Sequence, residues 1–243
     1  MKNNKFLLIV CISFLMATVL TFGIRQDSSI AENGSNFVNK IQINKSGKVA
    51  KDNLDNIIKI NAGLLKKTPG LTIVATINDT VDLSAEEFDY MKKMYVAYDM
   101  NKSDNYIFNV LLEEKIKLAE VQKKGLIPTE KEITDYILME QKIAGENPEV
   151  LREIINSSGL TEDDYWNIFE RFYATKIVAF SKLSQSIFKD AGIENTDKVG
   201  LELLETQKEY YKKFIGELKD KATVTINKEY KDFSYDKKIL TVK

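Results

Sequence analysis

The chain has 243 residues, 44% of them hydrophobic and 29% charged, and its 35 Lys and Arg nearly balance its 36 Asp and Glu. It therefore lacks the excess of basic residues that nucleic-acid binding requires. The sequence has no histidine and one cysteine, which excludes Ser-His-Asp and Cys-His catalysis, histidine-containing zinc sites and an intrachain disulfide. We expect a binding protein that is not an enzyme and needs no cofactor or metal.

An uncharged, apolar run at residues 6–24 follows Lys2 and Lys5. At about 1.5 Å per residue this run nearly crosses a hydrocarbon layer of about 30 Å, and it is long for a signal peptide. The lysines on its N-terminal side predict a cytoplasmic N-terminus and an exported remainder. Residues 1–24 are therefore either a signal peptide or an N-terminal membrane anchor, and the rest of the protein is expected to be extracytoplasmic.

Residues 25–70 read as a polar spacer that contains one weakly amphipathic helix at 49–66, ended by Pro69 and Gly70. The β-branched run at 71–77 predicts a strand, and Asn78-Asp79 predicts a turn directly after it. The sequence leaves open whether the helix at 49–66 packs on the domain that follows.

Helix start signals recur through the next hundred residues. Ser84 and Thr129 each precede a glutamate by three residues, which is the pattern of a capping box, and Thr161 precedes an aspartate in the same way. Glycines follow two of the helical stretches where a C-terminal cap belongs. These signals predict helices at 84–100, 104–124, 129–145, 148–157 and 161–189, and apolar spacing predicts another at 196–219.

A second strand is predicted at 222–226, after the last helix. A lone strand leaves its backbone groups unpaired, so we expect it to pair with the strand near 73–77. The result is one mainly α domain at 71–227, closed by a two-stranded sheet from its two ends. Residues 228–243 are expected to be a polar tail with a short strand at 239–242.

This order of elements resembles the N-terminal chaperone domain of SurA and of PrsA-type foldases, in the superfamily of the trigger-factor peptide-binding domain. The matching segments are ATIND at 75–79, SAEEF at 84–88, LLEEKIKLA at 111–119, KGL at 124–126, TEKEI at 129–133, GLTEDDY at 159–165 and KATVTI at 221–226. The resemblance implies a helical fold that binds unfolded or partly folded exported polypeptides.

Two departures from the family limit what the resemblance implies. The connection from Phe188 to Thr196 is too short to hold a parvulin domain, and the chain lacks the histidines of parvulin sites, so prolyl isomerase activity is not expected. PrsA proteins are typically lipoproteins, whereas Cys11 follows Val10 inside the apolar run and does not form a lipobox.

The expected binding residues are apolar side chains on two predicted helices. The helix at 84–100 is apolar on more than one face, and Met and Tyr suit an adaptable surface. The alternative is that both faces are buried between neighbouring helices. The candidates for client contact are Phe88, Tyr90, Met91, Met94, Tyr95, Tyr98, Tyr165, Phe172 and Phe188. The carboxylate pairs Glu113-Glu114 and Asp163-Asp164 read as solvated charges on helices.

The expected function is ATP-independent holding of exported clients in an apolar groove between helices, because the chain has no nucleotide-binding loop. The alternative is a membrane-tethered module that binds one dedicated secretion or envelope partner. The expected partners are unfolded polypeptides and, through residues 6–24, the membrane. The sequence leaves the formation of a homodimer open.

Overall fold

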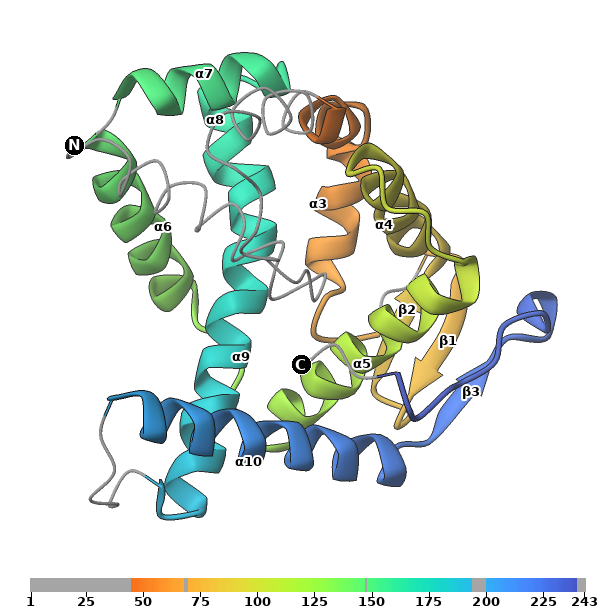
Figure 1. Cartoon of the computed structure of the whole chain (residues 1–243). Helices are drawn as coiled ribbons and strands as arrows, with labels where there is room; N and C mark the ends of the chain where they lie inside the picture. Colours follow the sequence, from red (N-terminus) through yellow and green to blue (C-terminus); the bar gives the residue numbers. More distant parts are fainter. Residues whose placement is uncertain (1–44, 68–69, 147, 194–199, 240–243) are drawn as a thin grey trace.

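The computed structural model describes residues 45–67, 70–146, 148–193 and 200–239 (Figure 1). The mainly α fold predicted from the sequence is confirmed. A helical segment at 45–52 comes first. The elements after it are α3 (Leu54–Ala62), β1 (Ile73–Ile77), β2 (Val81–Ser84), α4 (Ala85–Ala97), α5 (Asp104–Lys123), α6 (Glu130–Gly145), α7 (Pro148–Ser158), α8 (Glu162–Asp164), the π-helix η1 (Tyr165–Glu170), α9 (Arg171–Asp190), α10 (Gly200–Lys221), β3 (Val224–Ile226) and the 3₁₀ helix η3 (Lys228–Tyr230).

The sheet joins the two ends of the helical block, as the sequence predicts. Strand β1 pairs antiparallel with β3, placing Ala75 opposite Ile226 and Ile77 opposite Val224. The prediction of a two-stranded sheet is wrong, because β2 pairs with the other edge of β1 and makes the sheet three-stranded. Asn78 and Asp79 form the tight turn between them and both adopt positive φ, which suits a two-stranded hairpin.

The helices begin where their capping residues predict. Thr129 and Glu132 form a complete capping box at the start of α6. The Ser84 hydroxyl accepts a hydrogen bond from the Glu87 amide at the start of α4, but the Glu87 carboxylate does not return to Ser84 and contacts Lys115 instead. The long helix predicted at 161–189 is present as α8, η1 and α9, with a π-helical turn that the sequence did not predict.

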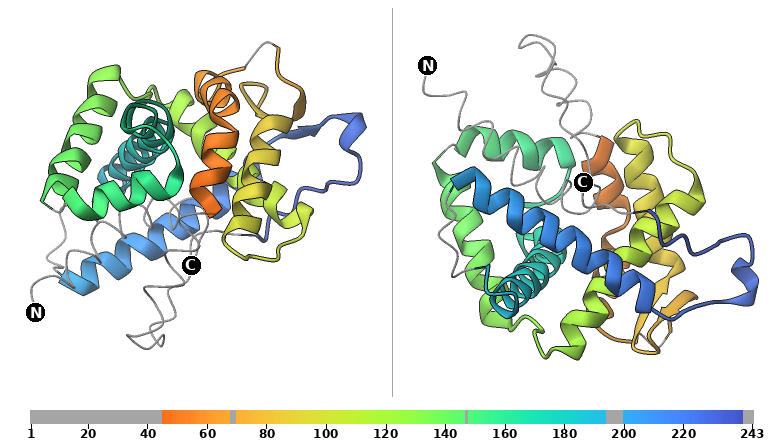
Figure 2. Two further views of the ribbon diagram at one scale, coloured as in Figure 1. Left: turned by 90° about the horizontal axis from the view of Figure 1, so that it is seen from above. Right: turned by 60° about the horizontal axis from the view of Figure 1, so that its bottom comes forward.

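Helix α5 is the central element of the fold. It contacts both strands of the β1–β2 hairpin and the helices α4, α9 and α10. Helix α6 lies on one side of α9, whereas α3, α4 and the sheet lie on the other (Figure 1; Figure 2). Helix α7 crosses above the start of the long helix towards the 45–52 helix (Figure 1). Helix α10 crosses the base of α9 and α5 and returns the chain to the sheet (Figure 1).

The domain is larger than the predicted block at 71–227, because the assumed spacer contributes to the core. Ala50, Ile57, Ile60 and Leu64 are buried with the side chains of α4, α5 and α9 in one cluster. Helix α3 packs against α4, η1 and α9. The assignment of residues 45–66 to a spacer is therefore wrong, whereas residues 25–44 lie outside the described part of the chain.

The C-terminal residues also pack on the domain. The ring of Phe233 stacks on Phe108 of α5 at 4.6 Å between centroids. Asn109 fixes the backbone beside it, donating to the Ser234 carbonyl at 2.9 Å and accepting from the Asp236 amide at 2.6 Å. The description of this segment as a tail is therefore wrong for residues 228–239. The short strand predicted at 239–242 is not present at residue 239, and residues 240–242 lie outside the described part of the chain.

Candidate functional site

Most of the predicted client-binding residues lie in the hydrophobic core. None of the following is more than 6% exposed: Tyr90, Met91, Met94, Tyr95, Tyr165 and Phe172. Helix α4 packs against α3 as well as α5, so both of its apolar faces are covered. The expectation that these residues face a client is therefore wrong for the described structure. The physical reason is α3, whose packing on the domain the sequence leaves open.

The other three predicted residues, Phe88, Tyr98 and Phe188, are half-buried and make contacts within the fold. Phe88 meets the Phe233 ring edge-on at 5.0 Å, and Phe188 meets the Tyr211 ring at 6.4 Å. Burial raises the pKa of Tyr98 to about 12, although a hydrogen bond with Ser46 acts in the opposite direction. These side chains join separate elements of the domain and do not form one open surface.

Helix α5 carries buried charges, contrary to the expectation for Glu113 and Glu114. Charged side chains are rarely buried unless they are paired. Four neighbouring charged residues of α5 are almost inaccessible to solvent: Glu113, Glu114, Lys115 and Lys117. The other predicted carboxylate pair, Asp163-Asp164, lies at least partly in solvent at the start of the long helix, as expected.

Two of these charges pair with residues on helices packed against α5. Lys115 lies 2.7 Å from Glu87 of α4, and Glu114 lies 2.8 Å from Lys176 of α9. The Lys176 ammonium also lies 4.2 Å from the centre of the Phe172 ring, a cation–π contact. Burial raises the pKa of Glu87, although the charge of Lys115 opposes this effect. The pairs fix how α4 and α9 sit on α5.

The third carboxylate, Glu113, joins α5 to α10. Its oxygens lie 3.5 Å from the Lys219 ammonium and 3.6 Å from that of Lys117. Lys219 also donates to the carbonyl of Ile239, so the C-terminal segment is attached at the same point. Burial lowers the pKa of Lys219. All three carboxylates face ammonium groups inside the core, an arrangement that supports helix packing.

Exposed apolar side chains identify a different candidate surface, on α6. Leu138 and Met139 are 56% and 47% exposed, although they follow each other in the middle of a folded helix. Ile133 and Ile137 of the same helix face inwards and are buried. Ile127, just before α6, is also exposed. We refer to Leu138 and Met139 as the α6 apolar pair.

The sequence reading missed this pair, but a signal for it was present. Ile133, Ile137 and Ala144 already supply the apolar stripe that α6 needs to pack on α9. Two large apolar residues next to that stripe have no place in the same core. Leu204, on α10, is another large apolar side chain with most of its surface exposed. Helices α6 and α10 both pack against α9 (Figure 1).

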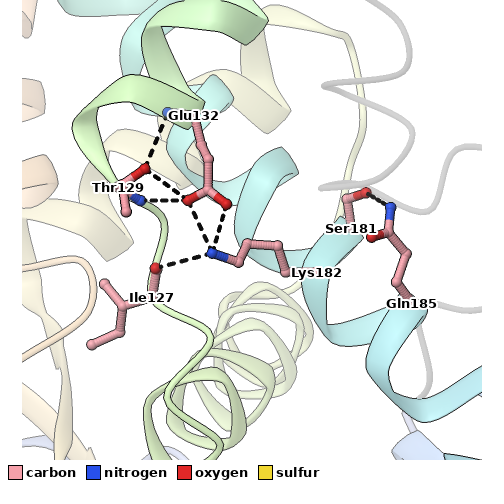
Figure 3. A network of polar contacts seen from close by, with 6 residues as sticks. All are labelled: Ile127, Thr129, Glu132, Ser181, Lys182 and Gln185. Carbon is pink, nitrogen blue, oxygen red and sulfur yellow. Dashed lines mark hydrogen bonds and ion pairs between the residues drawn. The ribbon is translucent and has the colours of Figure 1, made fainter. Parts of the chain in front are cut away.

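A polar network holds the start of α6 against α9 (Figure 3). The Lys182 ammonium donates to both carboxylate oxygens of Glu132, at 2.8 and 2.9 Å, and to the Ile127 carbonyl at 3.3 Å. The same carboxylate accepts from the amide and hydroxyl of Thr129. Arg171 of α9 also forms an ion pair with Glu130, the first residue of α6. Helix α6 is therefore attached at its base by side chains and not by apolar packing alone.

This network predicts a pH dependence of stability. The hydrogen bonds from Lys182, and then those from Thr129, lower the pKa of Glu132 from 4.5 to about 2. An acid with a lowered pKa in the folded state stabilises it above the unfolded value, and that contribution is lost as pH falls from about 4.5 towards 2. We expect Glu132→Gln to lower the melting temperature at pH 6, with the difference from wild type vanishing near pH 2.

The measurement is thermal unfolding followed by circular dichroism across this pH range. Glu149→Gln, which removes an exposed carboxylate from the first turn of α7, is the control and should follow the wild-type profile. A Glu132→Gln difference that stays constant at every pH would show that the carboxylate acts through its shape and not through its charge.

Two surface hollows have charged side chains in their walls. One of about 880 Å³ lies between the 45–52 helix and α7 and has charged walls of both signs, among them Lys51, Arg152 and Glu149. The other, of about 450 Å³, lies between the β1–β2 turn, α5 and the end of α10, and is lined by Lys123, Lys221 and Glu120 together with the apolar side chains of Ile116 and Leu218. Among the described residues, no cluster of three or more acidic or cysteine side chains is arranged to hold a metal.

No helix within the described ranges is long and apolar enough to cross a membrane. The predicted apolar run at 6–24 lies outside those ranges. The geometry thus defines a mainly α domain with a charged core and an exposed apolar pair on α6. The chain matches no protein-family model, and neither a curated protein nor a solved structure is significantly similar to it.

Proposed function

We propose that the protein is an extracytoplasmic, ATP-independent chaperone-like protein that binds unfolded or partly folded exported polypeptides. Residues 6–24 would tether it to the membrane or direct its export. Prolyl isomerase activity is not part of the proposal. The observation that carries it is the exposure of Leu138 and Met139 side by side on a helix that is fixed to the rest of the domain.

The α6 apolar pair has the chemistry of a weak and broad binding surface. Contiguous apolar surface that stays in solvent often marks a site where a partner binds. Methionine adapts to different apolar shapes because its side chain is unbranched and flexible. Each client segment that covers the pair gains free energy from the apolar area removed from water.

The proposal is tested with the full chain reconstituted in lipid nanodiscs. Two unrelated aggregating proteins are mixed with it at stoichiometric ratios, and light scattering is followed, with empty nanodiscs as the blank. We expect both proteins to aggregate less. Replacing the pair, as Leu138→Ser with Met139→Ser, removes about 1.5–3 kcal/mol of apolar burial. The concentration needed for half-suppression should therefore rise about tenfold or more.

Val96→Ser is the matched control, because Val96 is a large exposed apolar residue on α4, away from α6. Its activity should equal that of wild type. Loss of activity in the control as well would mean that general surface hydrophobicity, and not the α6 pair, holds the client. If wild type suppresses neither protein, the general chaperone is excluded and a module for one dedicated partner becomes the better description.

A further inference from the structure

The last described segment of the chain is bound to α5 through its backbone. After η3 the chain turns back towards α5 (Figure 1), where residues 233–236 form no helix or strand. The Asn105 Oδ1 accepts a hydrogen bond from the Ser234 amide at 2.9 Å. The Asn109 side chain donates to the Ser234 carbonyl at 2.9 Å and accepts from the Asp236 amide at 2.6 Å. Two amide side chains one helical turn apart therefore bind alternate residues, which is the period of an extended chain.

One aromatic side chain of the segment lies beside these bonds. The Phe233 ring stacks on Phe108 of α5 at 4.6 Å and meets Phe88 of α4 edge-on at 5.0 Å. Phe108 is fully buried, whereas Phe88 and Phe233 are half-buried. The two helices thus offer a contact for one ring next to two side-chain amides that bind backbone. We refer to Phe88, Asn105, Phe108 and Asn109 as the α5 face.

The residue types on the α5 face fit the binding of backbone. Asparagine is a poor helix former because its side chain competes for backbone hydrogen bonds. Asn109 nevertheless lies inside α5 and is 0% exposed, and a buried amide is costly unless it is hydrogen-bonded. Its other bond within the described residues goes to the Asn105 carbonyl, at 2.8 Å. The C-terminal segment therefore satisfies the Asn109 oxygen and its remaining N–H.

The segment itself has the character of a replaceable ligand. None of residues 228–239 is fully buried. The three bonds to Asn105 and Asn109 use its backbone groups, which every residue except proline can supply; the Ser234 hydroxyl adds one long contact, at 3.5 Å, to the Asn105 Oδ1. Main-chain hydrogen bonds for affinity, with side-chain contacts for selection, are typical of surfaces that bind extended peptides.

We infer that the α5 face is a binding site for an extended polypeptide segment with an aromatic residue, and that the chain's own residues 233–236 occupy it in the free protein. The inference rests on the proposed function for the natural partner, an exported polypeptide, and adds a second surface to the α6 apolar pair. Tyr235 and Lys237 donate hydrogen bonds to carbonyls of α10 and keep the segment beside the face. A tethered competitor acts at an effective concentration of about millimolar, so a client has to displace it.

The experiment measures how a fluorescein-labelled synthetic peptide with the sequence of residues 228–239 binds to the full chain in lipid nanodiscs. Fluorescence anisotropy gives the dissociation constant, and circular dichroism shows that each variant is folded. Wild type is expected to bind the peptide weakly, because its own segment competes. Phe233→Ser removes the ring contact of that segment, so the same peptide should bind about tenfold more tightly.

A second release variant, Ser234→Pro, removes the amide hydrogen that Asn105 accepts without changing an apolar side chain. It should give the same gain, also where Phe233→Ser folds poorly. Asn105→Ala, added to either release variant, should abolish the gain, whereas Asn101→Ala, at an exposed position before α5, should preserve it. Equal affinities in wild type and the folded release variants, or a gain that persists with Asn105→Ala, would overturn the inference. Aggregation is not measured, so this failure is distinct from a failure of the proposed function.

Discussion

Replacing Lys176 with methionine is expected to lower the free energy of unfolding by about 3–5 kcal/mol. Lys176 is almost fully buried, and its ammonium lies 2.8 Å from the equally buried Glu114. Methionine keeps most of the volume of the side chain but leaves the Glu114 carboxylate without this counter-charge. An uncompensated buried charge is costly because the interior cannot solvate it as water does. Unfolding in urea at pH 7, followed by circular dichroism, measures the change.

The double variant Lys176→Met with Glu114→Leu separates charge from packing. Removing both partners takes away the unpaired charge, so most of the lost stability should return. Lys131→Met is the surface control: its pair with Asp135 is exposed, and exposed pairs contribute about 0–1 kcal/mol. A double variant as unstable as the single one would assign the effect to the lost contact of Lys176 with the Phe172 ring and not to the charge of Glu114.

Replacing Gly47 with alanine is expected to destabilise the domain by about 3 kcal/mol, at the upper end of the range for overpacked positions. A β-carbon at this position would lie 2.2 Å from the Cα of Ser158 and 2.5 Å from its Cβ. The nearest atom belongs to the backbone, so no rotation of a flexible side chain can relieve the contact. The 45–52 helix would have to move away from the end of α7.

Gly216→Ala is the matched control for this substitution. Gly216 lies inside α10, and a β-carbon there would meet no atom within 4 Å. Alanine should therefore stabilise the domain by about 0.5–1 kcal/mol through its better helix propensity. Thermal unfolding of both variants measures the contrast. Equal stability of Gly47→Ala and wild type would mean that the 45–52 helix is not packed closely against α7.

The local elements of this protein could be predicted from short stretches of sequence. Ser84, Thr129 and Thr161 start their helices as the capping patterns predict, because a cap depends only on residues three positions apart. The pairing of β1 with β3 also followed, since an unpaired strand has few partners in a helical domain. Strand β2 was missed because four residues directly before a capped helix are too short for a clear alternating pattern.

The candidate site could not be predicted in the same way. Phe88 to Tyr98 carry apolar residues on more than one face, a pattern equally typical of an exposed binding helix and of a helix buried on both sides. Only the position of α3 decides between them, and α3 comes from a segment that composition alone describes as a spacer. The same reasoning explains the misplaced expectation for Glu113 and Glu114, whose counter-charge partners Lys219 and Lys176 are distant in sequence.

The sequence by itself thus determined the helical class, the start of each capped helix, the closing strand pair and the absence of histidine chemistry. Tertiary structure alone decided which faces are buried, because burial depends on neighbours that lie far apart along the chain. In the folded protein Tyr90 and Tyr95 of α4 and the charged residues of α5 are buried, whereas Leu138 and Met139 are exposed to solvent. Those two side chains are exposed because Ile133 and Ile137 already fill the contact of α6 with α9.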